Sequence, residues 1–338
     1  MSDYILEAVN LTKKFALEAG LFARKDRFVY AVNDVTLGIE RGKTYGLVGE
    51  SGCGKTTTAR LLVQMYKQSS GSIFYRPSQN TQLSLESVPQ KDSSACLNVE
   101  SFSRTELKNY REKVKYIFQD PGRSLNPRMS VFNILTAAYR YSSLWPGKKQ
   151  ARAEAAALLE EVGLDPSDLD RRPSEFSGGQ RQRISIARGL IMKPEILICD
   201  EVVSALDVSV QGQILNLLNE LKSKRNLSFL FIAHDLRVSS YFCDTIGVMY
   251  SGMLVEEAPA QDLYKTALHP YTKLLFCGAG SDSDGKTENE NGEVKTVLEE
   301  LKGCPFAHRC PKAQAKCRTE IPEFKSASEN HKVRCHFI

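Results

Sequence analysis

The sequence predicts an α/β fold built around a parallel sheet, and three short apolar runs carry that prediction. Residues 44–49 form an apolar run that ends in a glycine-rich turn, and a helix is expected to begin near Lys55. Residues 195–200 and 227–235 form two more runs, with an amphipathic helix expected at 207–224 between them. Buried parallel strands give continuous apolar runs of this kind. The order strand, helix, strand therefore favours a parallel core.

The remaining elements are expected on both sides of these runs. Two sequence features predict no regular structure: residues 76–106 have little periodicity and suggest an irregular surface insertion, and residues 280–293 are acidic and rich in Gly, Asn and Ser, which is typical of a linker. Residues 131–164 have a helical pattern. Strands are expected at 5–11, 29–39, 71–75, 114–120, 245–250 and 253–259, the last two joined by a turn at Ser251 and Gly252.

The composition predicts a soluble globular protein and argues against a nucleic-acid partner. The chain has 338 residues, of which 42% are hydrophobic and 25% are charged. Its net charge of +5 is too small to predict binding to nucleic acid. The N-terminal segment carries Asp3 and Glu7 without a long apolar stretch, and no run of about 18 apolar residues occurs. We therefore expect a cytosolic protein whose thiols stay reduced.

A phosphate-binding loop is predicted at residues 49–56, which fit the pattern G-x-x-x-x-G-K-[ST]. The glycines let the backbone turn tightly, so that successive N–H groups point at one anion. The helix that follows adds its positive end. Lys55 can reach the β- and γ-phosphates, and Thr56 can bind Mg²⁺. The expected ATP-binding residues here are Gly49, Glu50, Ser51, Gly52, Cys53, Gly54, Lys55, Thr56 and Thr57.

An acidic pair follows the apolar run at 195–200 and completes the expected catalytic set. Asp200 stands at the end of the predicted strand, where its carboxylate can hold Mg²⁺. Glu201 comes next and can orient a water molecule for attack on the γ-phosphate. Taken alone, these residues fit a solvated strand end equally well.

A third motif, SGGQ at residues 177–180, decides the class. Ser177 and Gln180 also fit an ordinary helix capping box. Together with the phosphate loop, Gln119 in YIFQDP, Asp200 with Glu201, SALD at 204–207 and His234, however, the motif resembles the ATP-binding cassette of ABC transporters. The resemblance implies a P-loop NTPase fold with a RecA-like parallel core, an antiparallel β subdomain and a helical signature subdomain at about 125–190.

The resemblance also implies a role for each matching position. Gln119 corresponds to the loop glutamine that contacts Mg²⁺, and His234 to the histidine that contacts the γ-phosphate. Phe15 resembles the residue that stacks on adenine, although Phe22, Phe28 or Tyr30 could replace it. Asp207 closes the SALD motif. The signature residues that would close over the ATP of a second cassette are Ser177, Gly178, Gly179 and Gln180.

The segments FQDPGRSLNPRMSV, CDEVVSALDVSVQGQILNLL and HPYTKLL resemble the ATPase subunits of oligopeptide/dipeptide permeases. The cassette is then expected at 1–265 and a C-terminal extension at 266–338. The family implies a second, non-identical ATPase subunit, two membrane permease subunits, an external solute-binding protein and a position on the cytoplasmic face of the inner membrane. We expect an ATPase that powers peptide uptake. Nickel or another small solute, and less favourably a soluble non-transport ABC protein or a scaffold without turnover, remain alternatives.

Four cysteines near the C-terminus predict a metal site. Cys304, Cys310, Cys317 and Cys335 have the spacing C-x₅-C-x₆-C-x₁₇-C, which matches neither the usual zinc knuckle nor the common ferredoxin patterns. Four thiolates suit either Zn²⁺ or a [4Fe–4S] cluster, and free buried cysteines are a further possibility. The resemblance to peptide-permease ATPases favours [4Fe–4S], because some members hold one in a similar extension. His308 and His331 are spare candidate ligands.

Overall fold

The structure, a computed structural model, describes residues 4–16, 28–78, 96–278 and 301–338. The chain forms two compact units. Unit 1 consists of Met1–Arg76, Ser94–Ser101 and Phe231–Ile338, and unit 2 consists of Pro77–Ser93 and Phe102–Leu230. The chain passes from unit 2 to unit 1 inside strand β8 (Ser228–Ala233). The expected linker at 280–293 lies outside the described residues.

Unit 1 contains a parallel strand pair that presents the phosphate loop. Strand β3 (Thr44–Val48) is buried throughout and runs parallel to β9 (Thr245–Tyr250), with Tyr45 opposite Thr245. Helix α1 (Lys55–Leu62) follows β3 after the glycine-rich turn. Antiparallel strand β10 (Met253–Pro259) pairs with β9. The expected strands at 44–49, 245–250 and 253–259 are thereby confirmed, as is the helix start at Lys55.

A second sheet of unit 1 is the expected antiparallel β subdomain. Its strand order is β2-β1-β4-β5, and each neighbouring pair is antiparallel. Strand β2 alternates between buried and more exposed residues from Val35 to Glu40, as expected where one face packs inward and the other meets solvent. The bounds of the strands are β1 (Tyr4–Ala16), β2 (Phe28–Glu40), β4 (Ser70–Tyr75) and β5 (Leu97–Asn98).

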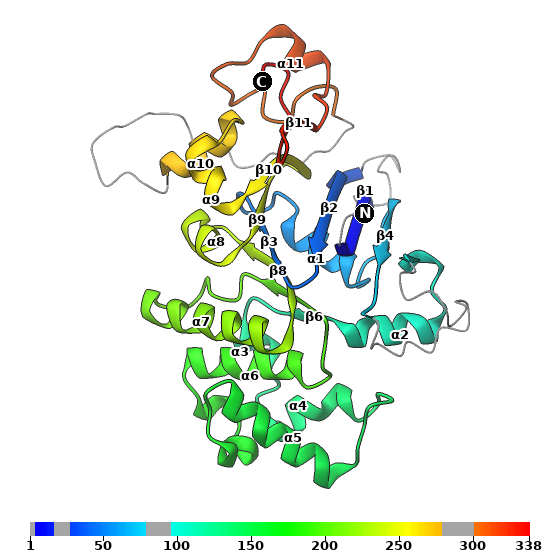
Figure 1. Cartoon of the computed structure of the whole chain (residues 1–338), viewed down its shortest axis with the longest axis vertical. Coiled ribbons are helices and arrows are strands. Elements are labelled where there is room, and N and C mark those ends of the chain that lie inside the picture. The colour runs from blue at the N-terminus through cyan, green and yellow to red at the C-terminus, as the bar shows by residue number, and fades with distance from the viewer. Residues whose placement is uncertain (1–3, 17–27, 79–95, 279–300) are drawn as a thin grey trace, which may run out of the picture. The chain divides into compact units, whose positions relative to one another are not determined.

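The C-terminal extension adds strands to the first sheet of unit 1. Strand β12 (His331–Val333) pairs with β10, so that Val333 lies opposite Glu256, and β11 (Lys325–Ser328) pairs with β12. The orange and red part of the ribbon therefore joins the yellow strand β10 directly (Figure 1). The helices of this half are α8 (Leu236–Phe242), α9 (Ala260–Thr266), α10 (Pro270–Gly278) and α11 (Ala315–Thr319).

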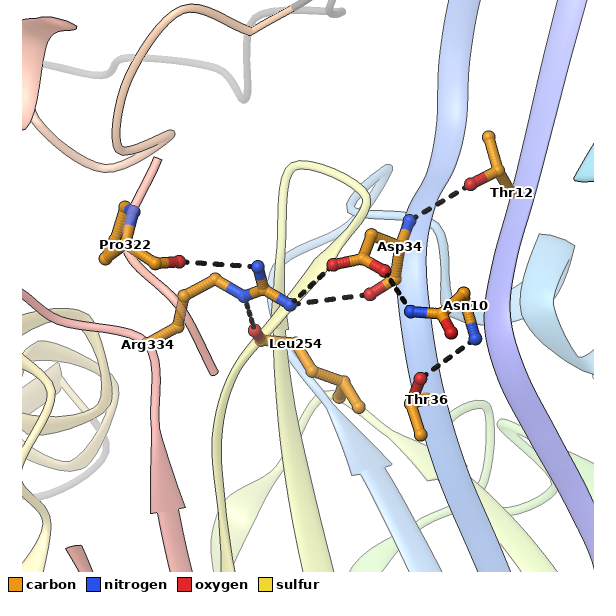
Figure 2. Close-up of polar contacts among 7 residues, drawn as sticks. All are labelled: Asn10, Thr12, Asp34, Thr36, Leu254, Pro322 and Arg334. Atoms are coloured by element: carbon orange, nitrogen blue, oxygen red, sulfur yellow. Dashed lines mark hydrogen bonds and ion pairs between the residues drawn. The ribbon is translucent and has the colours of Figure 1, made fainter. Parts of the chain in front are cut away.

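Arg334 fastens the extension to both sheets of unit 1. Figure 2 shows its guanidinium reaching Asp34 of β2 and the carbonyl oxygens of Leu254 and Pro322. Asp34 is itself fixed, because its carboxylate accepts a hydrogen bond from Asn10 Nδ2 at 2.7 Å and its N–H donates to Thr12. The extension is thus tied to the cassette by a buried charge as well as by strand pairing.

Unit 2 combines a parallel strand pair with a cluster of helices. Strand β6 (Val114–Ile117) lies parallel to β7 (Ile196–Asp200), which is buried throughout. Helix α6 (Gly178–Leu190) packs on α3, α4, α5 and α7, which run from teal to yellow-green in Figure 1. The other helices are α3 (Pro121–Ser124), α4 (Val131–Tyr139), α5 (Lys148–Glu161) and α7 (Val208–Arg225), with short 3₁₀ turns at Pro166–Asp170 and Pro173–Glu175.

The prediction of an irregular insertion at 76–106 is wrong for its described C-terminal part. Residues 79–95 lie outside the described chain, but Leu97 and Asn98 form β5 and Val99–Ser101 form a 3₁₀ turn. Helix α2 (Arg104–Lys113) begins at a capping box in which Ser103 and Glu106 satisfy each other's backbone N–H groups. The short apolar positions Leu97 and Val99 are buried, which a periodicity argument cannot detect in so few residues.

The single helical stretch expected at 131–164 is two helices. Helix α4 ends at Tyr139 and α5 begins at Lys148. Gly147 caps α5 with a φ of +93°, a conformation that favours glycine, and Pro146 precedes it. These two residues interrupt a pattern that is otherwise helical on both sides. None of the helices in the described ranges is long and apolar enough to cross a membrane.

Candidate nucleotide site

The phosphate loop in unit 1 has a backbone that only glycine suits at its closest approaches. Gly54 has a φ of +108°, and a Cβ there would lie 2.2 Å from the carbonyl oxygen of Ala31. Gly49, with a φ of +152°, is equally tight, since a Cβ would meet the Met249 carbonyl oxygen at 2.2 Å. The hydrogen bonds of α1 begin at Gly54, whose carbonyl oxygen accepts the N–H of Thr58 at 2.9 Å. The N-terminus of a helix that starts in this way is suited to bind an anion.

Lys55 lies folded against the loop that it belongs to. Its Nζ donates to the carbonyl oxygens of Gly49 at 2.7 Å and Glu50 at 2.9 Å, and the residue is 4% exposed. A cation held by two neutral carbonyls inside a glycine-rich loop is placed to attract phosphate oxygens. Thr56 and Thr57 follow on the first turn of α1 and are partly exposed, while Cys53 is buried beneath the loop.

Neighbouring segments of unit 1 brace the phosphate loop from both ends. The carbonyl of Cys53 accepts the N–H of Gly252 at 2.9 Å, from the turn between β9 and β10. The N–H of Glu50 donates to the hydroxyl of Tyr271 at 2.9 Å. Ser51 and Gly52 at the loop tip are exposed. His234 is also exposed and directly follows β8, at the end of a strand as expected.

Unit 2 contains two of the expected catalytic residues, Gln119 and Glu201, and the expected Mg²⁺ ligand Asp200. Asp200 ends β7, is 3% exposed and accepts a hydrogen bond from the hydroxyl of Tyr116. Glu201 follows with a φ of +49°, an uncommon conformation for a residue with a side chain. Gln119 Nε2 donates to Glu201 Oε2 at 2.5 Å. Backbone strain of this kind often marks a functional position.

The signature motif forms an exposed helix N-terminus in unit 2. Ser177 caps α6 by accepting the N–H of Gln180 at 3.3 Å, and Gln180 Oε1 accepts the Ser177 N–H at 3.0 Å. The capping box expected from the sequence is confirmed. Gly179 has no room for a side chain, because a Cβ would lie 2.7 Å from Val210 Cγ1. Asp207, three residues before Val210, caps α7 by accepting the Val210 N–H at 3.0 Å.

Phe15 lies near the end of β1 and is partly exposed. Its ring meets Tyr66 edge to face at 5.5 Å between centroids, and Lys13 Nζ lies 5.0 Å from its centre. Of the alternatives, Phe28 is 38% exposed, Tyr30 has Lys14 Nζ over its ring at 4.6 Å, and Phe22 lies outside the described residues. Phe15 and Tyr30 are both partly exposed, and each ring has a lysine ammonium group near it.

The four C-terminal cysteines share one cavity but are not gathered into a metal site. All four line a cavity of about 120 Å³ next to Phe306 and His269. All nine cysteines are free, and within the described ranges no group of three or more His, Cys, Asp or Glu side chains could hold a metal ion. A ready-made [4Fe–4S] or zinc site is therefore not found, contrary to our expectation. The spare candidates are engaged: His331 Nε2 lies 2.7 Å from Glu256 Oε1, and His308 is near the Tyr250 hydroxyl.

Burial favours the neutral form of a thiol. It is the main reason that the pKa of Cys304 rises to about 11, and the neighbouring cysteines contribute to that rise. Burial also raises the pKa of Cys310. A metal would have to displace these protons, since thiolates are the ligand form.

Three residues near the candidate site were not expected from the sequence. Tyr116 contacts Asp200, Tyr271 contacts the backbone of Glu50, and Arg309 forms an ion pair with the Glu50 carboxylate. Tyr116 lies on a strand that the sequence predicts, but nothing in its spacing identifies its partner. Arg309 stands between His308 and Cys310, two candidate metal ligands, and nothing in this spacing predicts a contact with Glu50.

Two family models match the chain in consecutive regions. The model described as ABC transporter matches residues 32–204. The model described as oligopeptide/dipeptide transporter, C-terminal region, matches residues 255–317. The first match includes the phosphate loop, the signature and the acidic pair, and the second begins in β10 and ends at Cys317.

Curated relatives match the chain over nearly its whole length. The oligopeptide transport ATP-binding protein AppF of Bacillus subtilis (strain 168) is 40% identical, covering 99% of this chain and 97% of the relative. The oligopeptide transport ATP-binding protein OppF of the same organism is 44% identical over 82% of each chain. A probable peptide ABC transporter ATP-binding protein of Sinorhizobium fredii is 38% identical over 99% of this chain and 90% of the relative.

Solved structures agree on the fold. CbiO1 from Clostridium perfringens, part of an ABC transporter complex, has a TM-score of 0.61 at 23% identity, covering 78% of this chain and 91% of that one. The dimeric cassette MJ0796, bound to ADP and Pi, has a TM-score of 0.60 at 23% identity, covering 76% and 99%. The chain therefore belongs to the oligopeptide/dipeptide ABC transporter family, as one of its ATP-binding, ATP-hydrolysing subunits.

Proposed function

We propose that the chain hydrolyses ATP to power the uptake of oligopeptides or dipeptides. The observation that carries this proposal is the pair of family matches, a cassette followed by the C-terminal region specific to oligopeptide/dipeptide transporters. The names of relatives that cover nearly the whole chain support the same solute class. Nickel or another small solute is the alternative, because a cassette does not itself contact the solute.

Each unit carries residues with a proposed role in ATP binding or hydrolysis. In unit 1, the loop at 49–57 and Lys55 bind the phosphates, His234 contacts the γ-phosphate, and Phe15 stacks on adenine. In unit 2, Glu201 accepts the proton of the attacking water, and Gln119 holds the carboxylate in position through its 2.5 Å hydrogen bond. Tyr116 keeps Asp200 oriented.

The donor set suits Mg²⁺, which prefers oxygen ligands and keeps some of its water. Thr56 of unit 1 has a hydroxyl oxygen suited to hold the ion, and Gln119 and Asp200 of unit 2 have amide and carboxylate oxygens suited to it. The bound ion would offset the negative charge that the phosphates carry during transfer. Asp200 is nearly buried, so little water reaches its carboxylate.

The exposed tip of α6 is the proposed contact with a second cassette. The N–H groups of Gly178 and Gly179, which the capping box does not use, and the helix dipole would attract the γ-phosphate bound by a companion subunit. That companion is a second, non-identical ATPase, and the assembly includes two membrane permease subunits and an external solute-binding protein. The chain would then lie on the cytoplasmic face of the inner membrane, with its cassette at 1–265 and its extension at 266–338.

The substitution Glu201→Gln tests the catalytic assignment. Loss of the general base should lower ATP turnover by at least about 100-fold, while ATP binding persists. Turnover and ATP affinity are measured on the purified chain assembled with its membrane subunits. Glu220→Gln removes an exposed carboxylate on α7 in the same unit and serves as the matched control. Turnover that survives in Glu201→Gln would remove Glu201 from this role and restore the scaffold alternative.

A metal centre at the four cysteines is a second proposal, supported by their common cavity. The thiols must lose protons and approach one another on binding, so a [4Fe–4S] cluster or Zn²⁺ would order this part of the extension. Anaerobically purified protein is analysed for bound iron, sulfide and zinc. Cys310→Ser should lose the metal, whereas Cys277→Ser, at an exposed cysteine outside the cavity, should retain it. Protein free of all three would contradict the proposal.

A further inference from the structure

The C-terminal extension places a positive charge directly on the phosphate loop. Arg309 Nη1 donates to Glu50 Oε2 at 2.8 Å, and Nη2 donates to Glu50 Oε1 at 3.0 Å. This two-pronged geometry is the strongest that an arginine and a carboxylate form, and it fixes direction as well as distance. The two residues are 259 positions apart in sequence but belong to the same unit.

A second residue of the extension fixes the same loop position. The hydroxyl of Tyr271, in α10, accepts the backbone N–H of Glu50 at 2.9 Å. The Tyr271 side chain is fully buried, and its ring packs against Tyr250 and Phe306 with centroids 4.6 and 5.4 Å away. Both the backbone and the side chain of Glu50 are therefore held by residues from outside the loop.

The extension is well anchored, so Arg309 acts from a fixed position. Arg334, 6% exposed, joins it to β2 and β10 (Figure 2). His331 pairs with the fully buried carboxylate of Glu256 in β10. The turn that carries Arg309 is itself closed by a hydrogen bond from the Arg309 N–H to the carbonyl of Phe306 at 3.0 Å.

The positive charge of Arg309 offsets the negative charge that Glu50 brings to the phosphate loop. Glu50 contributes a carboxylate to a loop that is expected to bind three phosphate groups, and like charges a few ångströms apart repel by about 1 kcal/mol or more. Arg309 offsets that charge and holds the carboxylate by both oxygens. Both side chains are 29% exposed, so solvent weakens the effect without removing it.

We infer that Arg309 is a positioning residue for ATP binding: it neutralises Glu50 and fixes it within the phosphate loop, so that the C-terminal extension sets the affinity of the cassette for ATP. The inference rests on the proposed role of residues 49–57 in binding phosphate. By the reciprocity of linked equilibria, bound ATP also stabilises the docked position of the extension.

A double-mutant cycle on the full chain tests this inference, with MgATP affinity measured by titration calorimetry. Arg309→Met leaves the Glu50 carboxylate unpaired and should weaken MgATP binding roughly tenfold. Arg309→Lys, which keeps the charge, should weaken it by only about twofold. In the Glu50→Gln background, Arg309→Met should weaken MgATP binding much less than it does in the unaltered chain, because no carboxylate is left to neutralise.

Two controls separate this effect from damage to the fold. Arg318→Met removes an exposed arginine of the same extension and should leave MgATP affinity unchanged. The loss in Arg309→Met should shrink in high salt, since screening weakens repulsion between charges but does not repair packing. If Arg309→Met unfolds, Arg309→Gln and Glu50→Gln/Arg309→Gln replace it in the cycle: Arg309→Gln should weaken MgATP binding more in the unaltered background than in the Glu50→Gln background.

The outcomes distinguish the inference from the proposal on which it rests. Lys55→Ala should abolish MgATP binding, and unchanged binding in that variant would overturn the phosphate-loop assignment itself. If Lys55→Ala abolishes binding while Arg309→Met binds like the unaltered chain, only the inference fails. It fails also if Arg309→Met weakens binding equally with Glu50 and with Gln at position 50.

Discussion

Arg334 carries a nearly buried charge between the extension and the two sheets of unit 1. Its Nη2 lies 3.2 Å from Asp34 Oδ2, Nε donates to the Leu254 carbonyl at 3.0 Å, and the guanidinium lies 5.5 Å from the Phe324 ring. Burial lowers the pKa of Arg334, and Asp34 raises it. An arginine in this place has to be paired, because an isolated buried charge is costly.

Replacing Arg334 should therefore destabilise the protein by more than the loss of one contact. Arg334→Met leaves Asp34 without its cation and two buried carbonyl groups without this donor. We expect a loss of about 2 kcal/mol in the free energy of unfolding, discounted because Asp34 is 43% exposed. Urea unfolding of the full chain measures it. Arg318→Met, at an exposed arginine, is the control, and equal stability of the two variants would contradict the account.

His269 gives the extension a pH dependence. Burial lowers the pKa of His269 to about 4, and its Nδ1 accepts the N–H of Tyr271 at 3.1 Å, a bond that the neutral ring makes. The unfolded chain therefore binds a proton near pH 6.5, and the folded chain only near pH 4. Stability is at its full value above pH 6.5 and falls as the pH drops toward 4.

The expected loss over this interval is about 2 to 3 kcal/mol, from the size of the pKa difference. Denaturant unfolding at a series of pH values, in the unaltered chain and in His269→Gln, measures the contribution. The variant should be less stable at neutral pH but should lose less on acidification. An identical fall with pH in both proteins would show that His269 is not responsible.

Two helices of unit 2 begin with the same capping device, and only one of them belongs to the candidate site. Ser177 caps α6 and Ser103 caps α2, each with a Glu or Gln three residues later that returns the hydrogen bond. The matched pair separates the structural role of such a serine from its role with nucleotide.

Ser177→Ala and Ser103→Ala should each cost about 1 kcal/mol of stability, because each leaves an N-terminal N–H unpaired. Only Ser177→Ala should also lower the ATPase rate of the assembled transporter, since only the tip of α6 is proposed to meet the γ-phosphate. Thermal unfolding and turnover are compared for both variants. An equal effect of the two substitutions on turnover would assign Ser177 a purely structural role.

Elements with a strong local signal could be predicted from the sequence. Strands β3 and β7 are buried throughout, so each appears in the sequence as a continuous apolar run. The glycines before α1 predict the turn that joins β3 to this helix. Helix α2 could not be found in this way, because its N-terminal signal follows a segment without periodicity. The break between α4 and α5 depends on Gly147 and Pro146, which a single helical pattern concealed.

Contacts between residues far apart in the chain could not be predicted from the sequence. The sequence identifies Gln119 and Glu201 as separate motif residues, and their hydrogen bond comes from the fold. The ion pair of Arg309 with Glu50 joins the extension to the phosphate loop, and no periodicity or spacing connects these positions. The four cysteines show that the number of possible ligands does not give their geometry: they line one cavity, but the described residues include no group of three or more side chains already placed to hold a metal ion.

At the scale of the whole molecule, ATP hydrolysis has to be coupled to transport through other subunits. None of the helices in the part of the chain that the structure describes is long and apolar enough to cross a membrane. In the proposed assembly, the membrane permease subunits provide the pathway for the peptide. The chain contributes the phosphate loop and His234 from unit 1, and the signature, Gln119 and the acidic pair from unit 2. Uptake should therefore stop whenever the chain binds ATP but cannot hydrolyse it.

The most direct test measures ATP hydrolysis and peptide uptake together in vesicles that contain the assembled transporter and its binding protein. With the unaltered chain, both should occur and should depend on ATP. With Glu201→Gln, ATP should still bind while hydrolysis and uptake are both lost. Peptide accumulation that continues with Glu201→Gln, or without ATP, would contradict the account.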